Sequence, residues 1–173
     1  MNHSETLNPK FTARLESLAA IALGSNLGNS LATLRSALST LNQTPGSKVK
    51  AISSWYQTEP IGPPQPNIIN GCALLETTLT PQDLLSVLLD IEKKFGRERH
   101  ERWGARTLDL DLLLFNDVVL DTKTLKIPHP RMTQRGFVMI PLAEIASNWI
   151  EPLCGRAISQ LVKTIDPTGV EKI

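Results

Sequence analysis

The sequence predicts an α+β fold of the ferredoxin-like type, a β-α-β-β-α-β sandwich with a carboxyl-terminal helical and hairpin addition. Strand-like apolar runs and helical stretches follow one another in that order, and 173 residues suit one compact domain. The order favours an antiparallel sheet with its helices on one face. We expect residues 1–18 to form a flexible extension and residues 19–173 a single domain. Weaker helical signals over 136–145 and 157–165 belong to the addition.

Four segments predict the strands of the sheet. They are short apolar runs bounded by turn-forming residues, namely residues 18–23, 49–57, 68–77 and 108–115. The loop over residues 58–66 contains four prolines and one glycine, so it can be neither a helix nor a central strand. A turn at residues 116–117 predicts that residues 118–120 return as the second arm of a hairpin.

Two helices are predicted by periodicity and by their end signals. One apolar stripe of the first helix is formed by Leu31, Leu34, Leu38 and Leu41. Asn29 or Ser30 can cap the start of this helix. In the second helix Thr80 is the predicted cap and Pro81 the first helical residue, and Gly96 ends it.

Composition and charge exclude several classes of protein. The chain has 18 Lys and Arg residues against 17 Asp and Glu residues, a net charge of +1, which argues against a general nucleic-acid binder. No apolar stretch approaches the roughly 18 residues of a membrane span, and residues 1–18 resemble neither a secretory signal nor a transit peptide. Cys72 and Cys154 have apolar neighbours and predict reduced core thiols. We expect a cytoplasmic protein, monomeric, with no nucleic-acid or membrane partner.

The strand at residues 108–115 carries two carboxylates. Side chains alternate across a strand, so one wholly apolar face is expected to hold Leu108, Leu110, Leu112 and Leu114. The other face is expected to hold Asp109, Asp111, Leu113 and Phe115. The two carboxylates then lie about 7 Å apart at the backbone and suit a hard cation such as Mg²⁺, which also takes water and phosphate oxygens. From this pair alone, two acids on a solvated face are an equally good interpretation.

A cluster of basic residues precedes this strand. Between Lys93 and Arg106 there are six basic residues and two acids. Such a run is usually a solvated face, but these arginines lead directly into the carboxylate pair. Arginine binds phosphate through two parallel hydrogen bonds and does not lose its charge. Arginines beside metal-binding carboxylates are typical of phosphoryl-type transfer from a nucleotide, with Trp103 as a mobile lid or stacking residue rather than a core residue.

Three further positions each have a functional and a structural interpretation. His129 stands between two prolines near Arg131 and Arg135, which suits phosphate contacts, and no second histidine stands at metal-ligand spacing. Asn70 interrupts an apolar strand and needs partners, either from the backbone or from a heterocyclic ligand. The turn at residues 24–28 lacks the lysine of a P-loop, so a plain strand-to-helix turn is as good an interpretation as a substrate contact.

Five motifs follow one another along the chain. They are Gly24-Ser-Asn-Leu-Gly28, Ser54-Trp-Tyr-Gln-Thr58 with the proline-rich loop, Gly96-Arg97, Arg102-Trp-Gly-Ala-Arg-Thr-Leu-Asp-Leu-Asp111, and Pro128-His-Pro-Arg131 through Arg135-Gly-Phe137. Together they resemble the 6-hydroxymethyl-7,8-dihydropterin pyrophosphokinase family of folate biosynthesis. The resemblance covers about residues 21–152, and the stretch that ends at Asp111 is long and specific.

The resemblance implies a pyrophosphokinase that moves the β,γ-pyrophosphate of ATP to the hydroxymethyl group of a reduced pterin and releases AMP. It implies two Mg²⁺ ions held by Asp109 and Asp111, with ATP and the pterin as small-molecule partners. The residues implied in catalysis are Arg97, Arg106 and Asp111. Those implied in ATP binding are Glu92, Arg99, Trp103, His129 and Arg135. Those implied in pterin binding are Thr58, Ile61, Asn70 and Phe137.

Two positions depart from the family pattern. Ile68 stands where the family often has an aromatic residue, which predicts stacking on one side of the pterin only, and Ala105 replaces the usual proline, which predicts a looser loop. Two other functions use similar features. An RNA-recognition module needs exposed aromatic residues on its central strands, and this sequence contains no such motif. A nucleotidyltransferase would release free pyrophosphate instead of AMP.

Overall fold

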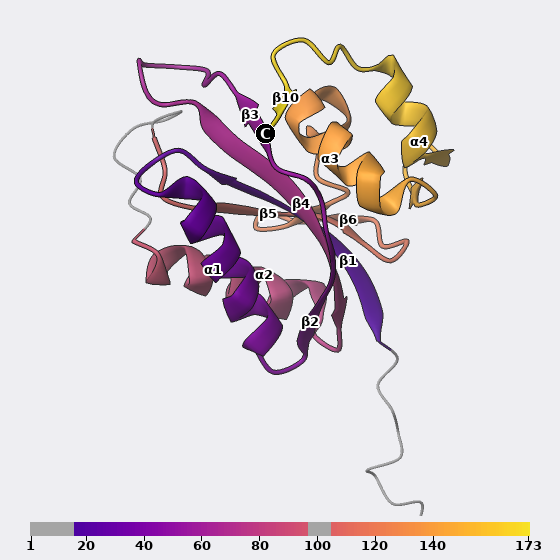
Figure 1. Cartoon of the computed structure of the whole chain (residues 1–173). Helices are drawn as coiled ribbons and strands as arrows, with labels where there is room; N and C mark the ends of the chain where they lie inside the picture. The colour runs from indigo at the N-terminus through magenta and orange to yellow at the C-terminus, as the bar shows by residue number, and fades with distance from the viewer. Residues whose placement is uncertain (1–15, 97–104) are drawn as a thin grey trace, which may run out of the picture.

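A six-stranded antiparallel sheet organises the residues that the computed structural model describes, 16–96 and 105–173 (Figure 1). Its strands are β1 (Ser17–Ser25), β2 (Ser47–Ile52), β3 (Tyr56–Thr58), β4 (Ile68–Thr77), β5 (Asp109–Phe115) and β10 (Glu171–Lys172). They pair in the order β10-β3-β4-β1-β5, and β2 also pairs with β4. This is the strand order of a split β-α-β sandwich, so the predicted fold class is confirmed.

Helices cover both faces of the sheet rather than one (Figure 1). On one face α1 (Ser30–Gln43) and α2 (Pro81–Lys94) bury their leucine stripes against β1, β4 and β5. On the other face α3 (Gly136–Ala146) and α4 (Ile158–Leu161) enclose a second apolar core. The carboxyl-terminal addition therefore covers the face that a simple two-helix sandwich would leave to solvent.

The predicted helix caps are those of the structure. The Asn29 side chain accepts a hydrogen bond from the Ala32 amide at the start of α1, and Thr80 does the same for Asp83 in α2, where Pro81 is the first residue. These caps satisfy amides that have no partner within the helix. The short remaining elements are β6 (Leu120–Asp121), β7 (Lys126–Ile127), β8 (Ile150–Glu151), β9 (Arg156–Ala157) and the 3-10 turns η2 (Met132–Gln134) and η3 (Val162–Thr164).

The alternation predicted for the strand at residues 108–115 is wrong at its end. Ala20 pairs with Leu114 and the next residue of β1, Ile21, pairs with Leu112, so Leu113 is an extra residue in β5. This β-bulge turns Leu114 to the α3 side and returns Phe115 to the α1 and α2 side. Asp109 and Asp111 precede the bulge and keep the alternation, so they stay on one face.

Three other predictions fail, two of them because tertiary pairing overrides the local pattern. The segment 118–120 does not return along β5, since β6 pairs with β7 instead. The run 49–57 is divided into β2 and β3, and between them the Ser53 hydroxyl accepts the Cys72 amide at 2.9 Å. Cys154 is exposed, whereas Cys72 is a buried thiol as predicted.

In residues 16–96 and 105–173 no helix has both the length and the apolar composition for crossing a membrane.

A cluster of hydrogen bonds fastens α3 to the edge of the sheet. Glu144 of α3 accepts hydrogen bonds from the Tyr56 hydroxyl and from the amide and hydroxyl of Ser54. Burial acts to raise the pKa of Glu144, but these hydrogen bonds outweigh it and hold that pKa below its usual value. Burial, together with the hydrogen bond to Glu144 and its negative charge, raises the pKa of Tyr56 to about 12.

Titration of Tyr56 is expected to have its midpoint near pH 12 rather than near 10. Because the pKa is raised on folding, protonated Tyr56 contributes fully to the free energy of unfolding below pH 10, and this contribution is lost as the pH rises towards 12. Tyrosinate absorbance measures this directly, since the chain has one tyrosine. In Glu144→Gln the midpoint should move part of the way back towards 10, because burial remains. Tyr56→Phe should lower the free energy of unfolding at neutral pH by about 1 kcal/mol. A wild-type midpoint near 10 would contradict this account.

Candidate active site

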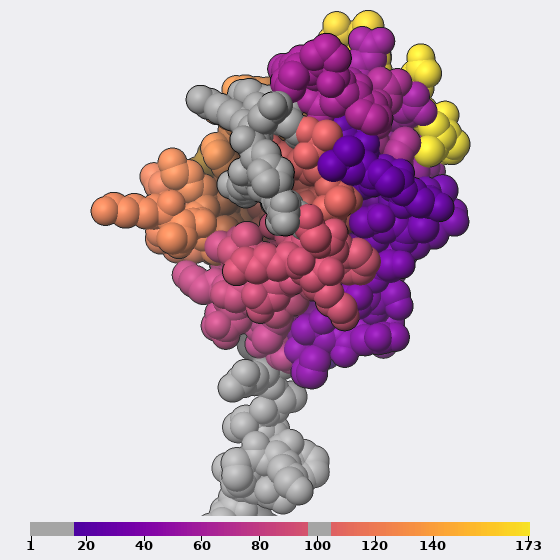
Figure 2. All heavy atoms as spheres, turned by 90° about the vertical axis from the view of Figure 1, so that its left-hand side faces the viewer, coloured from indigo at the N-terminus to yellow at the C-terminus, as the bar shows by residue number. Residues whose placement is uncertain are grey.

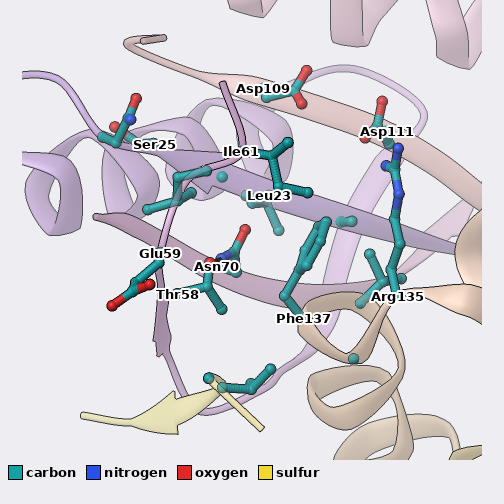
Figure 3. Close-up of a pocket in the computed structure, with 18 of the residues that line it drawn as sticks. Leu23, Ser25, Thr58, Glu59, Ile61, Asn70, Asp109, Asp111, Arg135 and Phe137 are labelled. Atoms are coloured by element: carbon teal, nitrogen blue, oxygen red, sulfur yellow. Dashed lines mark hydrogen bonds between the residues drawn. The ribbon is translucent and has the colours of Figure 1, made fainter. Parts of the chain in front are cut away.

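A cavity of about 780 Å³ opens on the α3 face of the sheet (Figure 3). Strands β1, β4 and β5, the proline-rich loop, the start of α3 and the carboxyl-terminal segment all contribute to its wall. Nine of the residues predicted for the site line it, namely Thr58, Ile61, Asn70, Arg106, Asp109, Asp111, His129, Arg135 and Phe137. The fold therefore gathers residues that lie up to 79 positions apart in the sequence, from 58 to 137.

The register of the sheet explains this gathering. Tyr56 lies opposite Asn70, Asn70 opposite Gly24, and Gly24 opposite Asp109. Cross-strand partners share a face, so these four residues form one row across β3, β4, β1 and β5. Asp111 lies opposite Ala22, one pair further along on the same face. The row has an amide at one end of the cavity and carboxylates at the other.

The carboxylate end is held from both sides of β5. Asp109 and Asp111 are half-buried, and the Arg106 Nη1 atom lies 3.0 Å from Asp109 Oδ2. On the opposite face, Glu92 of α2 is buried and accepts the amide of Leu110, which lies between the two aspartates, at 3.1 Å. Glu92 is therefore beneath the strand and is not among the described residues that line the cavity. It can fix the position of the two carboxylates, because it holds the backbone between them.

His129 and Arg135 add polar groups beside the carboxylates. The His129 amide donates to the Leu113 carbonyl at 2.9 Å, and its Nδ1 atom accepts the Arg131 amide at 3.2 Å. The neutral ring must therefore carry its proton on Nε2. Burial and then the cation of Arg135 lower the pKa of His129, against an opposing effect of Asp109. His129 can thus donate a hydrogen bond as a neutral group, next to the permanent charge of Arg135.

The other end of the cavity suits a flat heterocycle. The Asn70 amide donates to the Thr58 hydroxyl at 2.8 Å, and both side chains are buried. A Cβ atom at Gly24 would lie 3.2 Å from Asn70 Oδ1, so glycine leaves room for the amide. Phe137 faces this pair across the cavity (Figure 3), and the Arg135 guanidinium lies 5.6 Å from the Phe137 ring centre. Amide, hydroxyl and aromatic groups together can bind the edge and the face of a planar ring.

Asn26, which lies in the motif at residues 24–28 but was not predicted as a site residue, joins two loops of the site. Its side-chain amide donates to Gln65 Oε1 and to the Pro66 carbonyl, both at 2.9 Å, and its Oδ1 accepts the Arg106 amide at 2.8 Å. The proline-rich loop, the turn before α1 and the segment before β5 accordingly lie side by side in Figure 2. The one available signal was a polar residue inside the glycine-bounded turn at residues 24–28.

Replacement of Asn26 by alanine is expected to lower the free energy of unfolding by about 1–3 kcal/mol, because it removes the three hydrogen bonds by which this buried side chain joins the loops. Urea unfolding measures the loss. The matched control is Asn148→Ala at an exposed position, where the change should stay within about 0.5 kcal/mol. Equal stabilities of the two variants would show that Asn26 does not join the loops in solution.

Comparison with known proteins identifies the family. The family model described as 7,8-dihydro-6-hydroxymethylpterin-pyrophosphokinase (HPPK) matches residues 20–147. The chain belongs to the HPPK family. A 2-amino-4-hydroxy-6-hydroxymethyldihydropteridine pyrophosphokinase of Synechocystis sp. is 49% identical over 152 residues, which are 88% of this chain and 78% of the relative. The protein of the same name from Pseudomonas aeruginosa is 42% identical over 154 residues, 88% of this chain and 94% of the relative.

Solved HPPK structures share the fold. A Plasmodium falciparum HPPK-DHPS triple mutant matches with a TM-score of 0.70 at 16% identity, over 89% of this chain and 45% of that chain. An HPPK-DHPS in complex with substrates matches with a TM-score of 0.68 at 13% identity, over 86% and 43%. This chain thus spans less than half the length of those longer chains, and at such identities the likeness concerns the fold alone.

Some residues that the HPPK resemblance brings in cannot be compared with the structure. Arg97, Arg99 and Trp103 lie outside the described residues, so their roles stay predictions. Ile68, one of the two departures from the HPPK pattern, lines the cavity next to Asn70, where it offers an aliphatic rather than an aromatic surface. Ala105, the other departure, is the first residue described after the gap.

Proposed function

We propose that this chain transfers the β,γ-pyrophosphoryl group of ATP to the hydroxymethyl group of 6-hydroxymethyl-7,8-dihydropterin in folate biosynthesis, with release of AMP. The observation that carries the proposal is one cavity with two chemically different ends. Carboxylates and an arginine at one end suit a metal-bound triphosphate, and Asn70, Thr58 and Phe137 at the other suit a pterin ring. A cavity of about 780 Å³ falls within the usual size of small-molecule sites.

Asp109 and Asp111 fit Mg²⁺. Carboxylate oxygens are the ligands that this hard cation takes in small number, leaving its other positions to water and phosphate oxygens. Among residues 16–96 and 105–173 no group of three or more candidate metal ligands occurs, which agrees with a site completed by ATP itself. Two ions between the aspartates and the triphosphate would supply charge neutralisation and orientation of the phosphate chain.

The chain's own residues then bind and orient the reactants. Arg106, with Asp109 beside it, neutralises charge on the phosphates, and His129 and Arg135 bind the nucleotide from the facing segment. Asn70 and Thr58 hold the ring edge while Phe137 stacks on its face, so that the hydroxymethyl oxygen points to the β-phosphorus. A bond forms between that oxygen and the β-phosphorus. The bond from the β-phosphorus to the oxygen that bridges it to the α-phosphorus breaks, so that AMP leaves with the electron pair. We assign the acceptance of the hydroxyl proton to the Asp111 carboxylate, which lines the cavity.

ATP turnover with and without the hydroxymethyl-dihydropterin tests this proposal. The expected result is pterin-dependent formation of AMP, one AMP per pterin diphosphate, which is lost on chelation of Mg²⁺ and restored on its return. Release of free pyrophosphate would instead indicate nucleotidyl transfer, and release of ADP would indicate simple kinase activity. Either product would overturn the proposal.

We further infer a monomeric protein of the cytoplasm. Two cysteines without a disulfide agree with a reducing compartment. A described surface whose exposed large apolar residues are scattered over several elements agrees with a monomer. Light scattering after size-exclusion chromatography tests the monomer, with the expected mass of 19.0 kDa.

A further inference from the structure

The last eight residues of the chain, 166–173, form a segment that we call the carboxyl-terminal strap. It lies along the outer edge of β3 and over the start of α3 (Figure 1). Four of its residues line the cavity, namely Asp166, Thr168, Gly169 and Val170. No motif in the sequence pointed to these residues, and the HPPK family model ends before them, at residue 147.

The strap is fixed in place by several contacts. Glu171 and Lys172 pair with Gln57 and Tyr56 as β10 against β3, and the Ile173 amide donates to the Trp55 carbonyl at 3.0 Å. Within the strap, Asp166 Oδ1 accepts the amide of Thr168 at 2.9 Å and its hydroxyl at 2.6 Å. The strap is therefore a folded part of the cavity wall.

Close packing under the strap is made possible by a glycine. Gly136 is the first residue of α3, directly before Phe137. A Cβ atom at Gly136 would lie 3.2 Å from the Asp166 carbonyl oxygen and 3.3 Å from a methyl group of Val170. The strap thus rests on the backbone next to the aromatic ring that faces Asn70 and Thr58.

The position of the strap separates it from the phosphate chemistry. In the sheet order β10 and β5 are the two opposite edges, so the strap lies at the far side from Asp109 and Asp111. The pairing of Lys172 with Tyr56 and of Glu171 with Gln57, continued by one residue, aligns Val170 with Thr58. In Figure 3 the yellow strap ribbon lies on the side of Thr58 and Glu59, and the two aspartates lie on the opposite side.

We propose that the strap is a pterin-binding wall, in which Val170 contacts the heterocycle and β10 holds β3 so that Thr58 stays in position. The inference rests on the proposed function, because it adds a binding surface to the same site. Val170 is half-buried and is the one apolar side chain larger than alanine that the strap contributes to the cavity wall, where Phe137 and Ile68 are also apolar. Its methyl groups can cover the apolar face or edge of a ring whose polar edge is bound by Asn70.

Two variants test the strap. Val170→Ala removes methyl groups from the contact and is expected to raise the KM for the dihydropterin about fivefold, with the KM for ATP unchanged within about twofold. Deletion of residues 168–173 removes the wall and the bracing strand and is expected to raise the KM for the dihydropterin about tenfold or more. Binding of 6-hydroxymethylpterin, measured by its fluorescence with Mg²⁺ and a non-hydrolysable ATP analogue, should weaken in parallel.

The matched control is Val119→Ala, which removes the same atoms from an exposed position outside the cavity wall and should leave both KM values unchanged. If the deletion prevents folding, as judged by circular dichroism, Val170→Ala decides alone. An unchanged KM for the dihydropterin in Val170→Ala would overturn the inference, and so would equal increases for both substrates. Absence of pterin-dependent AMP from the wild-type chain is a different result, and it would overturn the proposed function itself.

Discussion

Replacement of Asp111 by asparagine is expected to lower kcat on the order of a thousandfold while the protein remains folded. Asparagine keeps the shape of the side chain but removes the charge that would hold a divalent cation and the proposed acceptor of the hydroxyl proton. Loss of one such preorganised electrostatic contact commonly lowers kcat about a hundredfold to a thousandfold. The proposal gives Asp111 two roles, binding of the cation and acceptance of the proton. Asp111 is half-buried on the open face of β5, so the core does not depend on its charge. AMP formation at saturating substrates measures the effect.

The control for this variant is Asp117→Asn. Asp117 is exposed in the turn that follows the same strand and is outside the cavity wall, so its replacement should leave kcat unchanged. Urea unfolding of both variants should agree with the wild type within about 1 kcal/mol. A magnesium titration adds a second measurement, because Asp111→Asn should need more Mg²⁺ for half-maximal activity. Near-normal turnover in Asp111→Asn would remove the carboxylate pair from the mechanism.

Local signals in the sequence were sufficient to predict the strands and helices whose bounds depend only on neighbouring residues. The strand predicted over residues 68–77 has those bounds in the structure, and α2 begins at Pro81 after its Thr80 cap. Period-two and period-3.6 patterns with caps depend on neighbouring residues only, so they survive without knowledge of the fold. The carboxylate pair could be predicted for the same reason, since Asp109 and Asp111 need only strand alternation to share a face.

Features that depend on distant pairing could not be predicted in this way. The bulge at Leu113 arises from the register of β5 against β1, and β6 pairs with β7 in a separate two-stranded sheet. Asn26 acts on residues 39 and 80 positions away, at Gln65 and Arg106. The strap belongs to the site because β10 adds to β3. Nothing in the local sequence of these segments specifies which strand or loop becomes their neighbour.

The functional residues divide along the same line. Membership of Thr58, Asn70 and Phe137 in one cavity follows from sheet order and from the position of α3. Asn70 was also indicated by its place in an apolar strand, whereas only the family resemblance pointed to Thr58 and Phe137 before the structure. Their contacts with a pterin remain predictions. Glu92 accepts the amide of Leu110 beneath the site, and its role in ATP binding likewise stays a prediction.

Arg106 is the other residue whose replacement should have a large effect, since its geometry is fixed at three points. Its backbone amide donates to Asn26 Oδ1 at 2.8 Å, and its carbonyl accepts the backbone amide of Asn26 at 3.1 Å. Its Nη1 atom lies 3.0 Å from Asp109 Oδ2. One edge of the guanidinium can bind the carboxylate while other donors bind a phosphate oxygen, because the group has five N–H donors in a plane. A lysine ammonium is a compact point charge and cannot reproduce this planar arrangement.

Arg106→Lys is therefore expected to lower kcat about a hundredfold although the net charge is unchanged, and Arg106→Ala to lower it further. Added guanidinium ion, at concentrations too low to unfold the protein, should restore part of the activity of Arg106→Ala and none of that of Asp111→Asn. The exposed Arg156 supplies the control, since Arg156→Lys should turn over like the wild type. A kcat within twofold of the wild type in Arg106→Lys would mean that charge alone suffices at this position. The planar guanidinium of Arg106, bound to Asp109 and to the phosphates at once, would then have no part in the reaction.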